Sequence, residues 1–230
     1  MTEASRIVAL VPMRHGSERI PGKNHREFAG RPLYHQIVET LLRVDSISEV
    51  VIDTDSPNIL VDAQRKFPEV RLLERPEHLR AGTVAMNDVI GHALTQVTAD
   101  HYLQTHSTNP LVRSETLSSM IETYLAQLEQ FDSLFSVTRH QKRYWTERRV
   151  PLNHDPAVLL RTQDLPPLFE ENSCVYLFSS RLFHQRTNRI GARPQLFEMD
   201  PIEAWDIDEE HDFLIAEALF AARRKGTLTP

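Results

Sequence analysis

The chain alternates between short runs of apolar, mostly β-branched residues and longer segments in which apolar residues recur at helical spacing. Residues 6–12 (RIVALVP) form the first apolar run, which predicts a strand buried on both faces. After Pro32, apolar residues recur every three or four positions, which predicts a helix that begins at that proline. Further strands are expected at 49–53, 70–73, 102–104, 133–137 and 173–178, and further helices at 57–67, 85–97, 114–130 and 209–224.

This regular alternation of strand and helix predicts the fold class. Consecutive strand–helix–strand segments form right-handed βαβ units, which build a mostly parallel sheet with helices on both faces. The alternation stops between 139 and 171, where four prolines interrupt any periodicity. We therefore expect a three-layer α/β/α protein in which residues 1–230 form one domain and 139–171 form an inserted arm.

Composition narrows the classes of protein that this chain can be. Its 230 residues are 40% hydrophobic and 25% charged, as in a soluble globular domain. No apolar run approaches the roughly 18 residues of a membrane span, and the first residues lack the apolar core of a signal peptide. With 1 Cys the chain cannot form an internal disulfide, so a cytoplasmic protein is expected. The formal charge of −6 argues against nucleic-acid binding.

Charge is nevertheless unevenly distributed along the chain. Residues 14–31 contain five Lys or Arg and two acidic residues, whereas residues 198–212 contain eight acidic residues and no Lys or Arg. Either segment alone is typical of a solvated surface. Together, a basic loop and an acidic segment suit a polyphosphate and a divalent cation.

The basic loop is the first candidate site. It follows the first strand, and open α/β sheets bind ligands at the carboxyl ends of their strands. Backbone N–H groups of Gly16 and Ser17 and the cationic side chains of Arg14 and Lys23 suit phosphate oxygens. The loop is not a Walker A motif, because its glycines have the wrong spacing and Asn24 stands where Ser or Thr would bind magnesium.

The acidic segment contains the second candidate site, Asp206-Ile-Asp208. In an extended segment, side chains two residues apart lie on the same face, so both carboxylates can converge on one Mg²⁺. The alternative is an acidic helix start that the helix dipole stabilises, which suits Glu209 and Glu210.

A third candidate follows the strand at 102–104. Gln104 and Thr108 lie in a polar segment at the carboxyl end of that strand, where they suit a hydroxylated substrate. Cys174, by contrast, lies in an apolar strand and is expected to be a core thiol.

These motifs carry a resemblance to a known family. The string RHGSERIPGKN (14–24) resembles the signature of the acylneuraminate (CMP-sialic acid type) cytidylyltransferases, and every fixed position of that signature is present. Asp206-Ile-Asp208 is similar to the Asp-Ile-Asp near the C-terminus of that family. Weaker similarities are Thr-Asp-Ser at 54–56, Arg75-Pro76, Arg-Thr-Gln-Asp-Leu-Pro at 161–166, and Asn172 with Tyr176.

The resemblance implies a Rossmann-like nucleotidyltransferase that transfers CMP from CTP to an acidic 2-keto sugar and releases pyrophosphate. It implies that Arg14 and Lys23 act in catalysis, that Asn24 and Arg75 contact the nucleotide, and that Mg²⁺ on Asp206 and Asp208 activates the acceptor hydroxyl. The acceptor would contact Gln104, Thr108, Asn172 and Tyr176, and the arm would reach the partner subunit of a homodimer.

Two departures from the family leave the acceptor open. The segment between Gln104 and Pro110 is two residues longer than in the sialic-acid enzymes and includes a histidine, and Gly82-Thr83 stands where an acidic residue is common. A cytidylyltransferase for 3-deoxy-octulosonate or a small phosphonate is therefore an alternative. A nucleotide-binding module without catalysis is another, since a fold alone does not establish a function.

Overall fold

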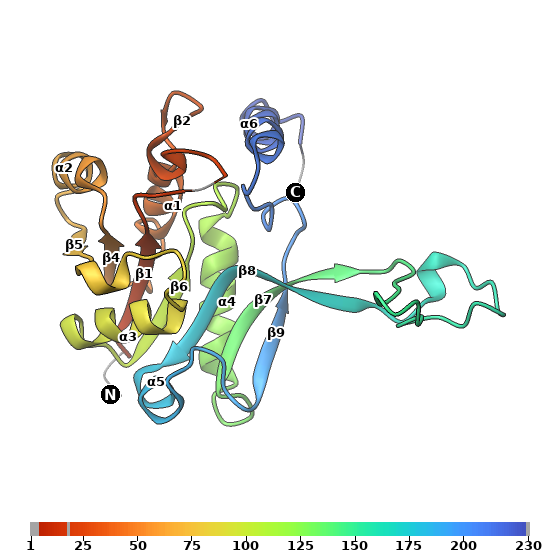
Figure 1. Ribbon diagram of the computed structural model, residues 1–230. Helices are drawn as coiled ribbons and strands as arrows, with labels where there is room; N and C mark the ends of the chain where they lie inside the picture. Colours follow the sequence, from red (N-terminus) through yellow and green to blue (C-terminus); the bar gives the residue numbers. More distant parts are fainter. Residues whose placement is uncertain (1–4, 18, 229–230) are drawn as a thin grey trace.

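The computed structural model describes residues 5–17 and 19–228, and it is built around one seven-stranded sheet (Figure 1). The strand order is β5-β4-β1-β6-β8-β7-β9. Only β8 runs antiparallel to its neighbours β6 and β7, so the predicted mostly parallel sheet is confirmed. The strands of this sheet are β1 (Ile7–Met13), β4 (Glu49–Thr54), β5 (Arg71–Glu74), β6 (His101–Thr105), β7 (Ser133–His140), β8 (Leu168–Ser179) and β9 (Pro194–Glu198).

Helices cover both faces of the sheet because alternate strand residues point to opposite sides. In β1, Ile7, Ala9 and Val11 pack on the side that carries α1, α2 and α4, whereas Val8 and Leu10 pack on the side that carries α3 and α5. All seven residues of β1 are buried, as its unbroken apolar sequence predicts. The helices are α1 (Tyr34–Leu41), α2 (Pro57–Lys66), α3 (Met86–Gln96), α4 (Ser114–Ala126), α5 (Ser180–Arg186) and α6 (Glu210–Arg224).

A third apolar cluster joins the two ends of the chain. Ile20 and Phe28 from the basic loop pack with Ile207 and with Phe213 of α6. Phe28 meets Phe213 edge-to-face, with 5.6 Å between the ring centroids. This cluster places the acidic segment directly beside the basic loop.

Pro32 does not begin the first helix, contrary to the prediction. It lies in β3 (Arg31–Pro32), which pairs with β2 (Glu27–Phe28) in a separate two-stranded sheet. The helix α1 begins two residues later, at Tyr34. The prediction failed because a proline at the edge of a short ribbon has the same local signal as a proline at a helix start.

The predicted arm is present as an extension of two sheet strands. β7 and β8 remain paired as far as His140 and Leu168, and residues 141–167 extend away from the sheet (Figure 1). The arm contains the short helix η3 (Thr162–Asp164) and an isolated bridge between Trp145 and Pro151. Among the described residues, no helix is long and apolar enough to cross a membrane.

Candidate functional site

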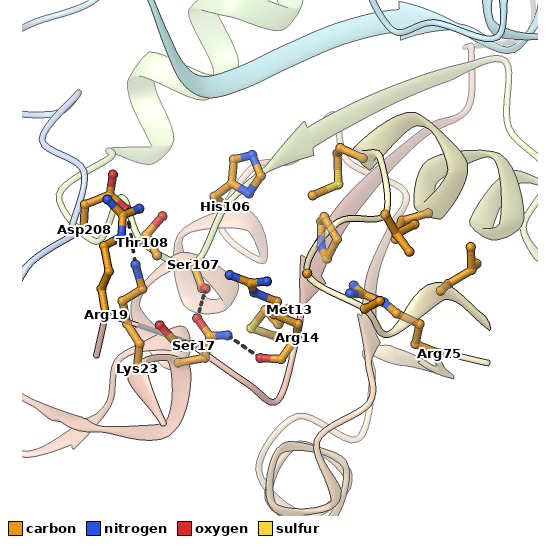
Figure 2. A pocket seen from close by; sticks show the side chains of 18 residues that line it. Met13, Arg14, Ser17, Arg19, Lys23, Arg75, His106, Ser107, Thr108 and Asp208 are labelled. Atoms are coloured by element: carbon orange, nitrogen blue, oxygen red, sulfur yellow. Dashed lines mark hydrogen bonds and ion pairs between the residues drawn. The ribbon is translucent and has the colours of Figure 1, made fainter. Parts of the chain in front are cut away.

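A cavity of about 540 Å³ lies where strands of the sheet end (Figure 2). Met13 and Arg14 reach it from the end of β1, Arg75 from the segment after β5, and His106 from the segment after β6. Its wall contains seven of the residues that the sequence predicts for the site, namely Arg14, Ser17, Lys23, Asn24, Arg75, Thr108 and Asp208. The loop after the first strand, the polar segment after β6 and the acidic segment therefore meet at one cavity.

The basic loop is shaped by Gly22 rather than by Gly16. Gly22 has φ 65°, a left-handed conformation that glycine adopts without strain, and it precedes the short helix η1 (Lys23–His25). A Cβ atom built on Gly16 would meet no atom within 4 Å. Gly16 lies outside the cavity wall, so phosphate binding by its backbone stays a prediction.

Lys23 connects the basic loop to the acidic segment. Its side chain is 11% exposed, and its Nζ lies 2.5 Å from the carbonyl oxygen of Ile207, to which it donates, and 3.5 Å from Oδ1 of Asp208. Arg19 contacts the same carboxylate with 2.6 Å between Nη2 and Oδ1. Because Lys23 is nearly enclosed, its ammonium group is fixed at the wall of the cavity.

Asn24 holds the loop to the neighbouring strand end. Its side-chain amide donates to the carbonyl of Arg14 at 3.1 Å, and its Oδ1 accepts from the hydroxyl of Ser107 at 2.7 Å. The predicted contact of Asn24 with a nucleotide is untested, but these bonds show that it positions Arg14. Ser107 was missed by the sequence reasoning, and no local motif distinguishes it from its polar neighbours.

Arg75 lines the cavity but is committed to a buried ion pair. Its Nε lies 2.5 Å from Oδ1 of Asp53, and both side chains are almost completely buried. Burial raises the pKa of Asp53, and Arg75 opposes that shift. The pair therefore joins the ends of β4 and β5, and Arg75 can offer a ligand only the donors that Asp53 does not use.

The two aspartates of the predicted metal site differ in their surroundings. Asp208 lines the cavity described above, and both Asp206 and Asp208 line an adjoining cavity of about 440 Å³. Oδ1 of Asp206 is buried without a hydrogen-bond partner. Burial raises the pKa of Asp206 and the charge of Asp208 adds to that rise, whereas Thr108 and the charge of Lys23 oppose it without cancelling it.

These observations fit a divalent cation. A buried carboxylate oxygen without a donor is costly unless a cation or a proton satisfies it. Two carboxylates suffice for Mg²⁺ when substrate phosphates and waters supply the remaining oxygens. Within the described residues, no group of three or more His, Cys, Asp or Glu side chains is placed to hold a metal, so any such site depends on the aspartate pair and the substrate.

The four residues predicted to bind the acceptor do not line a single cavity. Thr108 lines the first cavity and Asn172 the second, whereas Gln104 and Tyr176 line neither. Asn172 accepts from the Ser136 hydroxyl at 2.6 Å and is 8% exposed. Its side chain therefore also ties β8 to β7.

Gln104 is occupied by two residues that the sequence reasoning did not assign. Arg189 donates to Oε1 of Gln104 and lies 3.5 Å from the centre of the Tyr176 ring. The side-chain amide of Gln104 is 3.1 Å from Nε2 of His106. Arg189 had no sequence signal, while His106 stood out only as part of the longer loop.

His106 is held neutral in this environment. Burial, together with the positive charges of Arg189 and Lys23, lowers its pKa to about 4. A neutral imidazole has one donor and one acceptor nitrogen, and Nε2 of His106 is the acceptor when the side-chain amide of Gln104 donates to it. His106 therefore brings a polar but uncharged group to the cavity wall.

The sequence of this chain is similar to those of several curated cytidylyltransferases. The pseudaminic acid cytidylyltransferase of Campylobacter jejuni is 25% identical over 95% of this chain and 98% of its own length. The CMP-N,N'-diacetyllegionaminic acid synthase of Legionella pneumophila is 26% identical over 96% of this chain and 99% of its own length. The N-acylneuraminate cytidylyltransferase A of Danio rerio is 27% identical over 92% of this chain and 50% of its own length.

Solved structures show the same fold. A CMP:2-keto-3-deoxy-manno-octonic acid synthetase complexed with CTP superposes with a TM-score of 0.70 at 17% identity, covering 95% of this chain and 100% of the other. The 4-diphosphocytidyl-2C-methyl-D-erythritol synthase of Anaerococcus prevotii superposes with a TM-score of 0.69 at 12% identity, covering 95% and 97%. The family model for cytidylyltransferases matches residues 8–223. The chain therefore belongs to the cytidylyltransferase family.

Proposed function

We propose that this enzyme transfers CMP from CTP to an acidic 2-keto sugar of the nonulosonic acid class and releases pyrophosphate. The observation that carries the proposal is the meeting of Lys23 and Asp208 at one cavity, where a cation for phosphates lies beside a carboxylate for a metal. Two relatives that match nearly the whole of both chains are named for pseudaminic and legionaminic acids, which supports this class of acceptor. The buried free thiol of Cys174 suits a cytoplasmic enzyme.

In this proposal the basic loop binds the triphosphate. Lys23 and Arg14 face the cavity and would stabilise the negative charge that develops on the departing pyrophosphate. Asn24 would keep Arg14 in place through the carbonyl bond at 3.1 Å. Arg75 and the backbone of Gly16 and Ser17 would contact the nucleotide.

The acidic segment and the strand ends would handle the acceptor. Mg²⁺ held by Asp206 and Asp208 would supply charge neutralisation at the reacting phosphate and lower the pKa of the acceptor hydroxyl. Thr108 and Asn172 line the two adjoining cavities and would orient the sugar. Gln104 and Tyr176 would act indirectly. His106 and Arg189 contact the side-chain amide of Gln104, and Arg189 covers the ring of Tyr176.

The acceptor has a second candidate. The loop that contains His106 places a neutral imidazole in the cavity wall, where the sialic-acid signature has no histidine. A different acid, 3-deoxy-octulosonate or a small phosphonate, is the alternative that this difference favours. Pyrophosphate release from CTP, measured over a panel of pseudaminic, legionaminic, sialic, octulosonic and phosphonic acids, separates these acceptors.

The metal assignment has its own test. Asp208→Asn should reduce Mg²⁺-dependent pyrophosphate release at least ~100-fold, as expected when charge stabilisation of a transition state is lost. The fold should persist because the Asp208 side chain is 45% exposed. Glu209→Gln removes the neighbouring carboxylate, which is 48% exposed, and should leave the rate nearly unchanged. Normal turnover by Asp208→Asn would refute the assignment, and CTP binding without turnover on every acid would favour a module that only binds nucleotide.

We also propose that the arm mediates a homodimer. It exposes large apolar side chains, among them Leu159 at 89%, Leu152 at 56% and Trp145 at 51%. An apolar surface of this kind on a projecting segment is typical of a contact with another subunit. Light scattering should give a dimer mass for the wild type and a monomer mass for a Trp145→Ser, Leu159→Ser double variant. A dimer mass for the double variant would place the contact elsewhere, and a monomer mass for the wild type would refute the dimer.

A further inference from the structure

A cavity of about 320 Å³ lies outside the proposed active site, between α1, the start of α4 and the end of α6. Its volume is at the lower end of the range for small-molecule sites. Its wall is unusually rich in arginine, with Arg31, Arg43, Arg113, Arg223 and Arg224 against the two carboxylates of Glu39 and Glu115. None of these residues lines the two cavities that contain Lys23, Asp206 or Asp208.

The carboxylates nearby do not neutralise all five guanidinium groups. Glu39 contacts two of them, with 2.6 Å to Arg31 and 3.6 Å to Arg43. Behind the wall, Glu203 pairs with Arg113 at 2.5 Å. Counting Glu39, Glu115, Glu203 and Asp200, whose charge also acts on Arg223, against the five arginines leaves one positive charge in excess.

Two of these arginines, Arg223 and Arg224, lie at the end of α6. Within the described part of the chain, neither Arg223 nor Arg224 lies within salt-bridge distance of a carboxylate, although Arg223 donates to the carbonyl of Leu111 at 2.5 Å. Burial lowers the pKa of Arg223 and Arg113 adds to that shift, whereas the charges of Glu203 and Asp200 oppose it. An arginine that loses water without gaining a directly paired carboxylate favours the binding of an anion.

A buried side chain in the same wall also lacks an acceptor. Gln36 is 4% exposed, and its Oε1 accepts from Arg31 at 2.7 Å, but its Nε2 has no hydrogen-bond partner. Buried amide donors are almost always satisfied, so an unpaired one needs an explanation. The first turn of the helix α4 adds further N–H donors at the positive end of the helix dipole, because Ser114 and Glu115 line the cavity.

We propose that this cavity binds a small phosphoryl anion. Planar guanidinium groups bind phosphate oxygens through paired hydrogen bonds, and Gln36 would donate a further bond. A carboxylate offers only two oxygens to these donors, whereas a phosphoryl group offers three. Inorganic phosphate and pyrophosphate share the required chemistry, and pyrophosphate would be the product of the proposed reaction.

Substitution of Gln36 gives a sharp test. Gln36→Glu keeps the shape and the oxygen that accepts from Arg31, but it replaces the unpaired donor with a carboxylate oxygen that repels an anion. Gln185→Glu introduces the same charge on the exposed surface of α5 and serves as the matched control. Arg224→Gln removes an exposed charge from the cavity and provides a second variant with little risk to folding.

Calorimetric titration of phosphate, pyrophosphate and acetate at constant ionic strength separates this cavity from the active site. The wild type should bind phosphate at two classes of site, of which Lys23→Gln removes one and Gln36→Glu weakens the other at least tenfold. Arg224→Gln should weaken that second class, Gln185→Glu should match the wild type, and acetate should bind at least tenfold more weakly than phosphate. A second class that survives Gln36→Glu unchanged, or that is absent from Lys23→Gln, would overturn the proposal. Stronger binding of pyrophosphate than of phosphate would identify the product as the better ligand, and the reverse would identify free phosphate.

Discussion

The Nζ atom of Lys23 lies 3.5 Å from Oδ1 of Asp208, although the two residues come from opposite ends of the chain. The carbonyl oxygen of Ile207, 2.5 Å from the same nitrogen, fixes the lysine from a second direction. One side chain thus serves two purposes, because it joins the basic loop to the acidic segment and presents a positive charge to the cavity.

Lys23→Met should therefore affect stability and turnover together. Loss of the buried donor leaves the Ile207 carbonyl unsatisfied, which should cost about 1–3 kcal/mol in the free energy of unfolding. Loss of the charge should lower kcat/KM for CTP at least ~100-fold. Urea denaturation and steady-state kinetics measure the two effects, and Lys66→Met at the end of α2 is the control that should change neither. A variant that loses stability alone would contradict the role of Lys23 in binding phosphate.

The buried pair of Asp53 and Arg75 should be the most sensitive ion pair at the site. Asp53→Asn leaves an uncompensated charge on Arg75, whose side chain is only 5% exposed, and should cost about 3–5 kcal/mol of stability. Glu74→Gln breaks the nearby contact with Arg80, where the glutamate is 70% exposed, and should cost less than about 1 kcal/mol. Urea denaturation at neutral pH measures both, and equal costs would show that burial does not set the strength of these pairs.

Asp206 should reduce stability in the absence of a metal. Its Oδ1 is buried without a partner, so Asp206→Asn should raise the free energy of unfolding by about 1 kcal/mol in metal-free buffer. The same variant should lose any rise in Tm that Mg²⁺ produces in the wild type. Asp45→Asn, at an exposed position, controls for the change in net charge. A full Mg²⁺ effect on Tm in Asp206→Asn would rule out a metal on this residue.

Asp62 should make stability depend on pH in the acidic range. Burial alone would raise its pKa, but hydrogen bonds from Tyr34 and His35, each at 2.6 Å, outweigh burial and lower the pKa. A carboxyl group with a lowered pKa in the folded state adds stability above its unfolded pKa of about 3.9, and this stability is lost as the pH falls through the folded value. Asp62→Asn should therefore be less stable than the wild type at pH 7 by about 1.5–3 kcal/mol, and the difference should shrink as the pH falls below about 4. A difference that stays constant down to pH 3 would contradict this linkage.

The elements with strong periodicity were predictable from the sequence, and those shaped by distant contacts were not. All residues of β1 are apolar and buried, so its sequence alone identifies it. The strand β9 alternates partly exposed residues at the edge of the sheet and α5 has only seven residues, so neither has a clear pattern. Pro32 shows the converse, since a good local signal gave the wrong element.

The same distinction holds for the site. The uneven charge along the chain singled out the basic loop and the acidic segment, and the structure brings them together, also outside the cavity wall, where Arg26 lies 2.5 Å from Glu210. The sequence could not show that Asp53 occupies Arg75, or that Arg189 and His106 occupy Gln104. Those partners are distant in sequence or carry no motif, so only the packed chain reveals them.

The position of β8 in the sheet affects how the sheet folds and how well it tolerates insertions and deletions in the arm. β8 lies between β6 and β7, so these earlier strands keep open edges until the chain has passed through residues 141–167 and returned. The entropy of closing such a loop grows only with the logarithm of its length, and doubling the length costs about 0.6 kcal/mol. Insertions and deletions in the arm should thus hardly alter the stability of the sheet, so the proposed subunit contact in this segment can change while the strands that frame the cavity stay in register.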